Sequence, residues 1–491
     1  MGRTSEKNTP TDSALTYNPE EAFLFLRLFP SLFVMIRTIL KIAAVVSTLS
    51  VTPLVCGAES YAIVVSKTTH ADPEWKPVVD ALQKKHSGTV LEFDQSLDET
   101  LPELRRLFPK YACVVAKPEE AGRAFVAKMH QLSRQLNDDP YPDFIWGIVT
   151  GYEATDALRL AKHQQPLDVK RALTGTVGSP LEFYHEGVMF SELKAKAMWR
   201  KGPGEKVTPG ECVQDTTKLI VDSLNEDQPD VFITSGHATE RDWQLGFTYR
   251  NGYFRCQDGQ LYGLDTRGKR HPVHSPNPKV HLAVGNCLIA HIPDRQCMAL
   301  ALMHSAGVYQ MVGYTIPTWY GFGGWGVKDY FSELQAGRFT LAEAHHANQI
   351  ALIHNLETLP ANNHHRRGLE ADRDVVVLYG DPAWEARLPK RPLPWSQSLT
   401  EEDGTYTLTI TTNERGDWDN RPVVHFLPER LTDLKLLEGA EFKPIITDDF
   451  ILIKFHEGVQ PMKGNRGDTI PVRGDFEKGQ TFVIRFSAKT R

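Results

Sequence analysis

The feature that most constrains the fold is an alternation of short apolar, β-branched runs with helical segments between residues 61 and 382. β-branched runs favour strands, and an apolar stripe at helical spacing favours a helix. Strands that alternate with helices predict βαβ units, which form a mostly parallel sheet covered on both faces. The sequence therefore predicts an α/β fold for this part of the chain.

The expected elements follow from these runs and their flanking residues. The strands are expected at residues 61–66, 89–93, 111–116, 144–149, 172–178, 230–236, 280–286, 307–315 and 375–382. The helices are expected at residues 74–86, 98–107, 119–136, 154–162, 211–225 and 327–336, the last after a glycine-rich turn at 321–326. A further helix is expected to begin at Thr340, because "TLAE" is a capping box.

The last part of the chain has a different period. After the proline-rich "RLPKRPLPW" (387–395), apolar and polar residues alternate with period two, as in "TYTLTITT" (405–412) and "TFVIRF" (481–486). Turn residues separate these runs. The pattern predicts a separate β-sandwich.

The first residues have the pattern of a secretory signal peptide. Arg37 and Lys41 precede an apolar run, and small residues follow at Cys56-Gly57-Ala58. We expect translation to start at Met35, with residues 1–34 as an upstream extension, and export to the periplasm or the medium. A single membrane anchor, a buried helix, or lipid attachment at Cys56 are the alternatives. We expect no membrane span in the mature chain.

Composition excludes several classes of function. A net charge of −6 over 491 residues gives no basic surface for nucleic acid. The adjacent pairs His345-His346 and His364-His365 lack the i, i+4 spacing of metal ligands, and no H-E-x-x-H occurs. We therefore expect no catalytic metal and no cofactor, and leave a structural calcium open. Removal of Cys56 leaves five cysteines, an odd number, without a C-x-x-C pair.

Two of the predicted strands end on reactive side chains. "PDVFITSGHA" (229–238) ends at His237, and "KVHLAVGNCL" (279–288) ends at Cys287. Neighbouring parallel strands lie about 5 Å apart, and functional groups gather at their carboxyl ends. We therefore expect the sulfur and the imidazole within hydrogen-bonding reach in one solvent-open crevice. A Cys–His pair is the minimum needed for nucleophilic acyl transfer.

The surroundings of this pair suggest further roles. The amides of Ala238 and Cys287 are candidates for an oxyanion hole, and Gly236 and Gly285 allow unusual backbone angles before each residue. Asp143 and Glu240 are both candidates to orient the imidazole. A substrate pocket is expected from Asp242, Trp243, Trp319, Tyr320 and Gly321. A buried structural cysteine with a simple loop histidine is the alternative reading.

Five motifs resemble the gingipain family of cysteine peptidases, which has a caspase-like fold. They are "FIWGIVTGYEATDALRLA" (144–161), "FITSGHA" (232–238), "AVGNC" (283–287), "GVYQMVGYTIPTWYG" (307–321) and "LYGDPAWEARL" (378–388). The resemblance spans roughly residues 60–490. Two departures stand out: the family usually has glycine where this chain has Ala238, and the segment after Cys287 lacks the usual glycine and aromatic residue.

The resemblance implies a caspase-like three-layer sandwich with mostly parallel sheets in two subdomains, followed by an immunoglobulin-like domain. The expected divisions are residues 1–58, 59–165, 166–390 and 391–491. It also implies an exported cysteine endopeptidase in which Cys287 attacks the scissile carbonyl and His237 moves the proton. The expected partner is a peptide or protein substrate, often cleaved after a basic residue, and we expect a monomer. A catalytically inactive secreted binding protein and a metal-dependent hydrolase are the rival hypotheses.

Overall fold

A large, mostly parallel sheet runs through the described part of the chain, which in this computed structural model is residues 60–491 without 334, 415–420 and 456–475. The chain separates into two units, Met1–Gly57 and Ala58–Arg491, and the second contains all described residues. The predicted signal peptide, the start at Met35 and the lipid-attachment alternative at Cys56 therefore lie outside the described residues.

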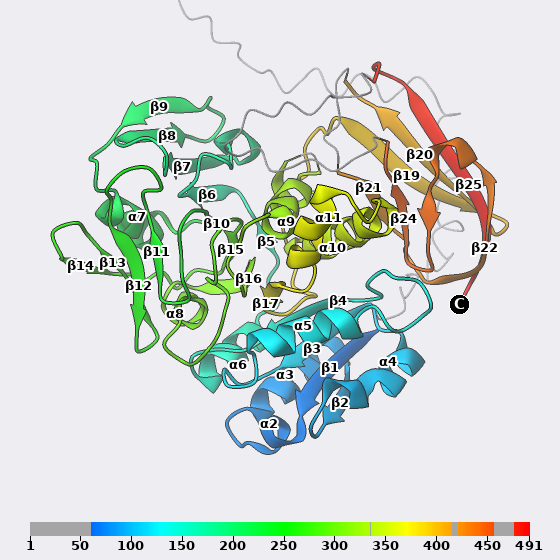
Figure 1. Cartoon of the computed structure of the whole chain (residues 1–491), viewed down its shortest axis with the longest axis horizontal. Helices are drawn as coiled ribbons and strands as arrows, with labels where there is room; N and C mark the ends of the chain where they lie inside the picture. Colours follow the sequence, from blue (N-terminus) through cyan, green and yellow to red (C-terminus); the bar gives the residue numbers. More distant parts are fainter. Residues whose placement is uncertain (1–59, 334, 415–420, 456–475) are drawn as a thin grey trace, which may run out of the picture. The chain divides into compact units, whose positions relative to one another are not determined.

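The central sheet contains both predicted and unpredicted strands. Its members are β1 (Tyr61–Ser66), β2 (Thr89–Phe93), β3 (Tyr111–Val115), β4 (Ile145–Val149), β6 (Arg171–Thr174), β7 (Glu186–Phe190), β8 (Ala197–Lys201), β9 (Thr208–Glu211), β10 (Val231–Thr234), β15 (Lys279–Ala283), β16 (Val308–Tyr314) and β17 (Val376–Tyr379). The order across the sheet is β2-β1-β3-β4-β17-β16-β15-β10-β6-β7-β8-β9 (Figure 1). Three neighbouring pairs are antiparallel, namely β16 with β17, β7 with β8, and β8 with β9.

Helices connect and cover these strands. They are α2 (Lys67–Ala71), α3 (Lys76–His86), α4 (Leu101–Leu107), α5 (Arg123–Leu132), α6 (Ala154–Lys162), α7 (Thr217–Asp222), α8 (Met298–Ser305), α9 (Phe322–Ser332), α10 (Leu341–Thr358) and α11 (His364–Asp372). Within the described ranges, none of these helices is both long and apolar enough to cross a membrane. Helix α3 packs against α6, and α9 packs against α10 and against β15 and β16.

Burial explains the strands that the sequence predicted well. Every residue of β1, β3, β4 and β16 is buried, as expected for parallel strands covered on both faces. Helix α10 begins with the predicted capping box, in which the Thr340 hydroxyl accepts from the Glu343 amide at 3.1 Å and the Glu343 carboxylate accepts from the Thr340 amide at 2.8 Å. The α/β prediction and this helix start are confirmed.

Several predicted boundaries are wrong. The helix expected at 211–225 is only α7 (Thr217–Asp222), because Thr208–Glu211 forms strand β9. Helix α5 is shorter than the expected 119–136, and β6 ends at Thr174 rather than at 178. The glycine-rich stretch 321–326 is not a turn before a helix, because α9 already begins at Phe322. These glycines allow close packing: a Cβ at Gly324 would lie 2.3 Å from the Val284 carbonyl oxygen, and one at Gly323 would lie 2.6 Å from Val376.

Several smaller sheets complete the described residues. Two of them are an antiparallel sheet of β11 (Asp242–Gln244), β12 (Tyr253–Gln257), β13 (Gln260–Leu264) and β14 (Arg270–Pro272), and a pair of β5 (Leu167–Asp168) and β18 (Ala386–Arg387). The C-terminal part forms two antiparallel sheets, β19 (Trp395–Glu402), β20 (Thr405–Thr412), β25 (Thr481–Thr490) and β22 (Leu431–Glu438), and β21 (Val423–Phe426), β24 (Phe450–Ile453) and β23 (Ile445–Ile446).

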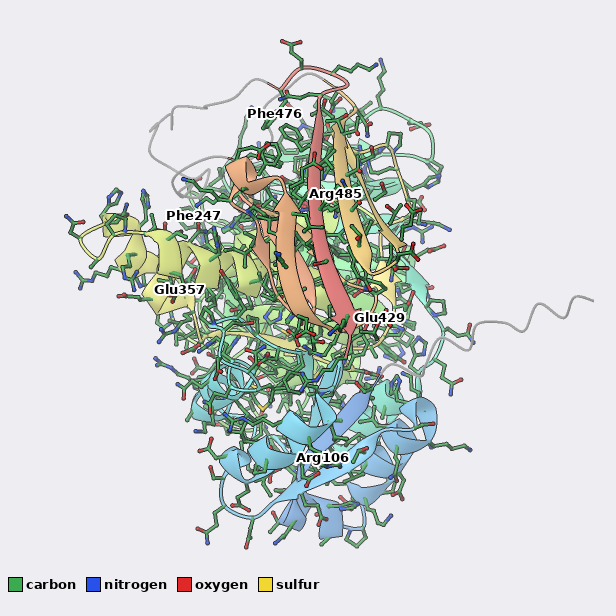
Figure 2. All side chains as sticks on the ribbon, turned by 90° about the vertical axis from the view of Figure 1, so that its right-hand side faces the viewer. Arg106, Phe247, Glu357, Glu429, Phe476 and Arg485 are labelled. Atoms are coloured by element: carbon green, nitrogen blue, oxygen red, sulfur yellow. The ribbon has the colours of Figure 1, made fainter. Side chains whose placement is uncertain are left out.

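The two C-terminal sheets share one apolar cluster, to which β20 contributes Leu408 and β24 contributes Ile451. Alternate residues of β20 are buried, which agrees with the predicted period of two. On the outer face, Arg485 of β25, labelled in Figure 2, pairs with Glu438 at 3.6 Å. The opposite residues of β24, Phe450 and Leu452, pack into the core of the central sheet instead.

Candidate active site

The strands that precede His237 and Cys287 are neighbours. β10 and β15 pair in parallel, with Thr234 opposite Ala283, and lie side by side in Figure 1. Each reactive residue stands in the turn just after its strand. The prediction that adjoining parallel strands of one sheet carry the two residues is confirmed.

Both residues line one cavity of about 330 Å³. Its walls come mainly from the turns that follow β6, β7, β10, β15 and β16, and the side chain of Trp325 on α9 adds a further part. Those five strands are mutually parallel, so the cavity lies at their common carboxyl edge. Binding and catalytic sites of open α/β sheets gather at this edge. The predicted shared crevice therefore exists.

Cys287 is half-buried, and the turn after β16 holds its sulfur. The Thr318 amide donates to Sγ at 3.2 Å, and Sγ lies 3.8 Å from the Thr318 carbonyl oxygen. The next residue, Leu288, has a φ of 57°, which is uncommon for a residue with a branched side chain. Its amide donates to the Ile316 carbonyl at 3.0 Å, so the same turn fixes the backbone after the sulfur.

His237 is exposed, and its ring stacks on Phe247, with ring centroids 4.6 Å apart and an interplanar angle of 21°. Phe247 is labelled in Figure 2. Among the described residues, no hydrogen bond joins the imidazole to the Cys287 sulfur, so the expected direct contact is not made in this structure. The two groups are held by different partners, Thr318 and Phe247. Catalytic hydrogen bonds often form only once substrate is bound.

The backbone around His237 is arranged as a tight hairpin. Gly236 has a φ of 96°, a value that favours glycine. Ala238 faces Trp243 as an isolated antiparallel bridge, flanked by hydrogen bonds from the Thr239 amide to Asp242 and from the Gln244 amide to His237. In such a pair the hairpin partner does not use the Ala238 amide. The amide therefore keeps its capacity to donate outside the hairpin.

The predicted substrate pocket is only partly right. Of its five residues, Trp319 lines the cavity and is 59% exposed. Trp243 is buried on β11, where its Nε1 donates to the Ser235 carbonyl at 2.8 Å, and neighbouring Asp242 does not reach the cavity. Tyr320 bonds to His365 Nδ1 at 2.9 Å, and Gly321 is the N-cap of α9 with a φ of 85°. These four residues do not line the cavity.

Neither candidate for orienting the imidazole contacts it. Asp143 lies just before β4, and its Oδ2 accepts from the Leu136 amide at 2.9 Å. The Glu240 carbonyl accepts from the Met298 amide at 2.8 Å, and its carboxylate lies 3.9 Å from Arg241. Within the described residues, no hydrogen bond or ion pair joins either carboxylate to the His237 imidazole.

Sequence reasoning missed Glu192, which lines the cavity although its side chain is only 7% exposed. Its Oε1 accepts from the Thr176 hydroxyl and its Oε2 from the Val177 amide, each at 2.8 Å. Burial raises the pKa of this carboxyl, while these hydrogen bonds act in the opposite direction. Glu192 follows β7, so the signal that could have found it was a charged residue at the carboxyl end of a strand.

The histidine pairs are engaged in packing. His345 and His346 on α10 are buried, and desolvation lowers their pKa values to about 4 and about 3. His345 Nε2 lies 3.3 Å from the Val376 carbonyl oxygen, and His364 stacks near His365. Across the described ranges, no cluster of three or more His, Cys, Asp or Glu side chains is arranged to hold a metal ion.

The other four cysteines within the described residues are free thiols away from the cavity. Burial raises the pKa of Cys297 to about 12 and that of Cys256 to about 11. A thiol with so high a pKa stays protonated near neutral pH and is a poor nucleophile.

Comparison of the chain with protein-family models, curated proteins and solved structures gives no match.

Proposed function

We propose that the chain is an exported cysteine endopeptidase of gingipain-like type, with a caspase-like three-layer catalytic part in two subdomains and an immunoglobulin-like C-terminal domain. The observation that carries the proposal is the cavity at the carboxyl edge of five parallel strands, which holds both His237 and Cys287. A thiol and an imidazole exposed to one cavity can perform acyl transfer on a peptide.

The proposed reaction has two stages. The Cys287 sulfur attacks the scissile carbonyl, and the proton from the thiol moves to the leaving amine through the His237 imidazole as the C–N bond breaks. Water then attacks the thioester and releases the acid product and the free thiol. In this proposal the amides of Ala238 and Cys287 donate to the oxyanion that forms in each stage.

The proposed substrate is a peptide or protein with a basic residue before the scissile bond. Glu192 supplies a carboxylate to the cavity wall, and a buried negative charge favours a cationic side chain. Leu193 and Trp319 line the same cavity and are 42% and 59% exposed, so they offer apolar contacts at its rim. A neighbouring apolar substrate residue fits these contacts.

The test combines peptide cleavage with labelling of the sulfur. The purified chain is incubated with a fluorogenic library that varies the residue before the scissile bond, and separately with a peptidyl chloromethyl ketone. We expect cleavage after Arg or Lys, label on Cys287 by mass spectrometry, and loss of both in Cys287→Ser and His237→Ala. Cys256→Ser is the matched control, since this thiol lies outside the cavity.

A catalytically inactive secreted binding protein is the second candidate, favoured by the lack of a hydrogen bond between Cys287 and His237 and by Ala238 in the place of a glycine. That function predicts labelling of Cys287 that is unchanged in His237→Ala, and no peptide cleavage. Cleavage that survives Cys287→Ser but stops with a chelator would instead indicate a metal-dependent hydrolase.

A further inference from the structure

A buried chain of hydrogen bonds joins the two strand ends behind the cavity. The Thr234 hydroxyl donates to Asn286 Oδ1 at 2.6 Å, and Asn286 Nδ2 donates to the Gly236 carbonyl at 3.2 Å. Thr234 and Asn286 are both fully buried. Thr234 is the last residue of β10, and Asn286 directly precedes Cys287. The hydrogen bonds therefore connect the turn that carries His237 with the turn that carries Cys287.

The direction of every bond in this chain is fixed. The Gly236 carbonyl can only accept, so it faces the amide nitrogen of Asn286, and the amide oxygen faces Thr234. The hydroxyl proton of Thr234 therefore points to Asn286, and its lone pair accepts from His281 Nε2 at 3.0 Å. Burial lowers the pKa of His281 to about 3, so this ring is neutral and carries its proton on Nε2.

These hydrogen bonds hold the backbone next to both His237 and Cys287. Gly236, whose carbonyl Asn286 holds, has a φ of 96° and directly precedes His237. The Asn286 carbonyl accepts from the Thr318 hydroxyl at 3.4 Å, and the Thr318 amide donates to the Cys287 sulfur at 3.2 Å. Asn286 is thus bonded to the turn that carries the imidazole and to the turn that holds the sulfur.

We infer that Asn286 is a positioning residue of this site: its side chain fixes the separation of His237 and Cys287. This inference rests on the proposed function. Asn286 lies behind the cavity wall and is not among the residues that line it. Its loss therefore misplaces the reacting groups without removing a contact to the substrate, and the effect falls on kcat rather than on KM.

The experiment uses the full chain and the best peptide of the library. Asn286→Ala and Thr234→Val each interrupt this series of hydrogen bonds, whereas Thr234→Ser keeps the hydroxyl. Thr100→Val is the matched control, because Thr100 is a buried threonine whose hydroxyl bonds to the Leu97 carbonyl at 2.7 Å, outside the cavity. Circular dichroism verifies folding, and the rate of Cys287 alkylation by iodoacetamide is followed against pH for each variant and for His237→Ala.

We expect Asn286→Ala and Thr234→Val to lower kcat by about 10- to 100-fold with KM within about twofold, since small misplacements cost rates of this order. Thr234→Ser and Thr100→Val should keep the wild-type kcat. The alkylation profile of Asn286→Ala should shift toward that of His237→Ala, and a double variant should show no further change.

Three results would overturn the inference: a wild-type kcat in the folded Asn286→Ala and Thr234→Val variants, an equal loss in Thr100→Val, or a loss confined to KM. If Asn286→Ala does not fold, the pair Thr234→Val and Thr234→Ser decides. A wild-type chain that cleaves no peptide and takes up no chloromethyl ketone at Cys287 instead refutes the proposed function, and the inference with it. The two failures are therefore distinguished by the wild-type assay.

Discussion

At the scale of single residues, the sulfur and the imidazole each have a partner of their own. The Cys287 sulfur accepts a hydrogen bond from the Thr318 amide, and the His237 ring stacks on Phe247. Both arrangements leave the reactive atoms beside the same cavity. The carboxylate of Glu192 lies in the same wall, so the cavity presents three polar or reactive side chains from three different turns.

The role of Glu192 in substrate choice can be tested by one isosteric change. Glu192→Gln removes the negative charge and keeps an acceptor for the Thr176 hydroxyl. Hydrogen bonds to charged groups contribute about 1.5–3 kcal/mol, so we expect kcat/KM for peptides with Arg or Lys to fall roughly 10- to 100-fold relative to norleucine peptides. Steady-state rates on matched peptides measure this ratio.

The control for that experiment is Asp242→Asn. Asp242 was a predicted pocket residue, but it lies on β11 outside the cavity, near Thr239. In this variant, the ratio of kcat/KM for peptides with Arg or Lys to that for norleucine peptides should equal the wild-type ratio. An unchanged ratio in Glu192→Gln would show that this carboxylate only braces the turn at Thr176 and Val177.

At the scale of elements, the sequence predicted where strands end better than where helices begin. The buried runs of β10 and β15 stop at a glycine-containing turn, and such a pattern needs only local information. Helix α9 was missed at its start because Gly323 and Gly324 read as a turn, whereas their lack of a side chain serves close contact with Val376 and the Val284 carbonyl. That contact is tertiary and leaves no local signal.

The same reasoning explains the predicted and missed parts of the site. His237 and Cys287 were found because each ends a buried strand, but the hydrogen bond between Trp243 and Ser235 requires a hairpin that folds back on β10. Glu192 follows β7, one of the central-sheet strands that the sequence did not predict. Contacts between strands that are distant in the sequence set these positions, and one sequence does not record them.

The tight packing of α9 predicts a large cost for added volume. Gly324→Ala places a methyl group 2.3 Å from the Val284 carbonyl oxygen, so the helix must move away from β15. We expect a loss of about 1–3 kcal/mol in the free energy of unfolding, measured in urea, together with lower peptidase activity because Gly285 and Trp325 line the cavity. Gly210→Ala is the control, because its Cβ would meet Met198 at 3.6 Å, an ordinary contact. Equal stability of the two variants would contradict the packing argument.

The start of α10 makes a second prediction for an element. Thr340→Ala removes the hydroxyl that accepts from the Glu343 amide, and we expect a loss of about 1 kcal/mol in the free energy of unfolding. Thr340→Ser keeps the hydroxyl and should stay within a few tenths of a kcal/mol of the wild type. Thermal and urea unfolding of the two variants measure the difference, and an equal loss in both would assign the effect to the methyl group instead.

At the scale of the whole described unit, the C-terminal sheets are attached to the central sheet by polar as well as apolar contacts. Arg421 pairs with Asp329 of α9 at 2.9 Å, and the Tyr330 hydroxyl donates to the Pro422 carbonyl at 2.7 Å. Arg430 pairs with Asp448 at 2.7 Å and donates to the carbonyl of Asp143. The last contact brings together several carboxyl groups from distant parts of the chain.

Burial makes this junction sensitive to pH. Desolvation raises the pKa of Asp143 to about 8, and nearby Asp449 and Asp139 act in the same direction. Desolvation likewise raises the pKa of Asp449 to about 7, against the favourable charge of Arg430. An unperturbed aspartate has a pKa of about 3.9, so between roughly pH 4 and 8 the folded chain binds more protons at Asp143 than the unfolded chain does. This contribution to stability is complete below pH 4 and is lost as the pH rises to 8.

Asp143→Asn replaces the carboxyl by a neutral group of the same shape, whose oxygen can still accept from the Leu136 amide. Titrating groups far from Asp143 act equally in both proteins, whereas Asp449 is coupled to it, so the difference in unfolding free energy reports this pair of carboxyls. Relative to the wild type, the variant should gain up to about 1.4 kcal/mol per pH unit between roughly pH 4 and 8, and the gain should level off above pH 8. Urea unfolding at half-unit pH steps measures the difference. Asp94→Asn, at an exposed aspartate, should give a pH-independent difference; the same flat line for Asp143→Asn would show that this carboxyl is ionised in the folded chain.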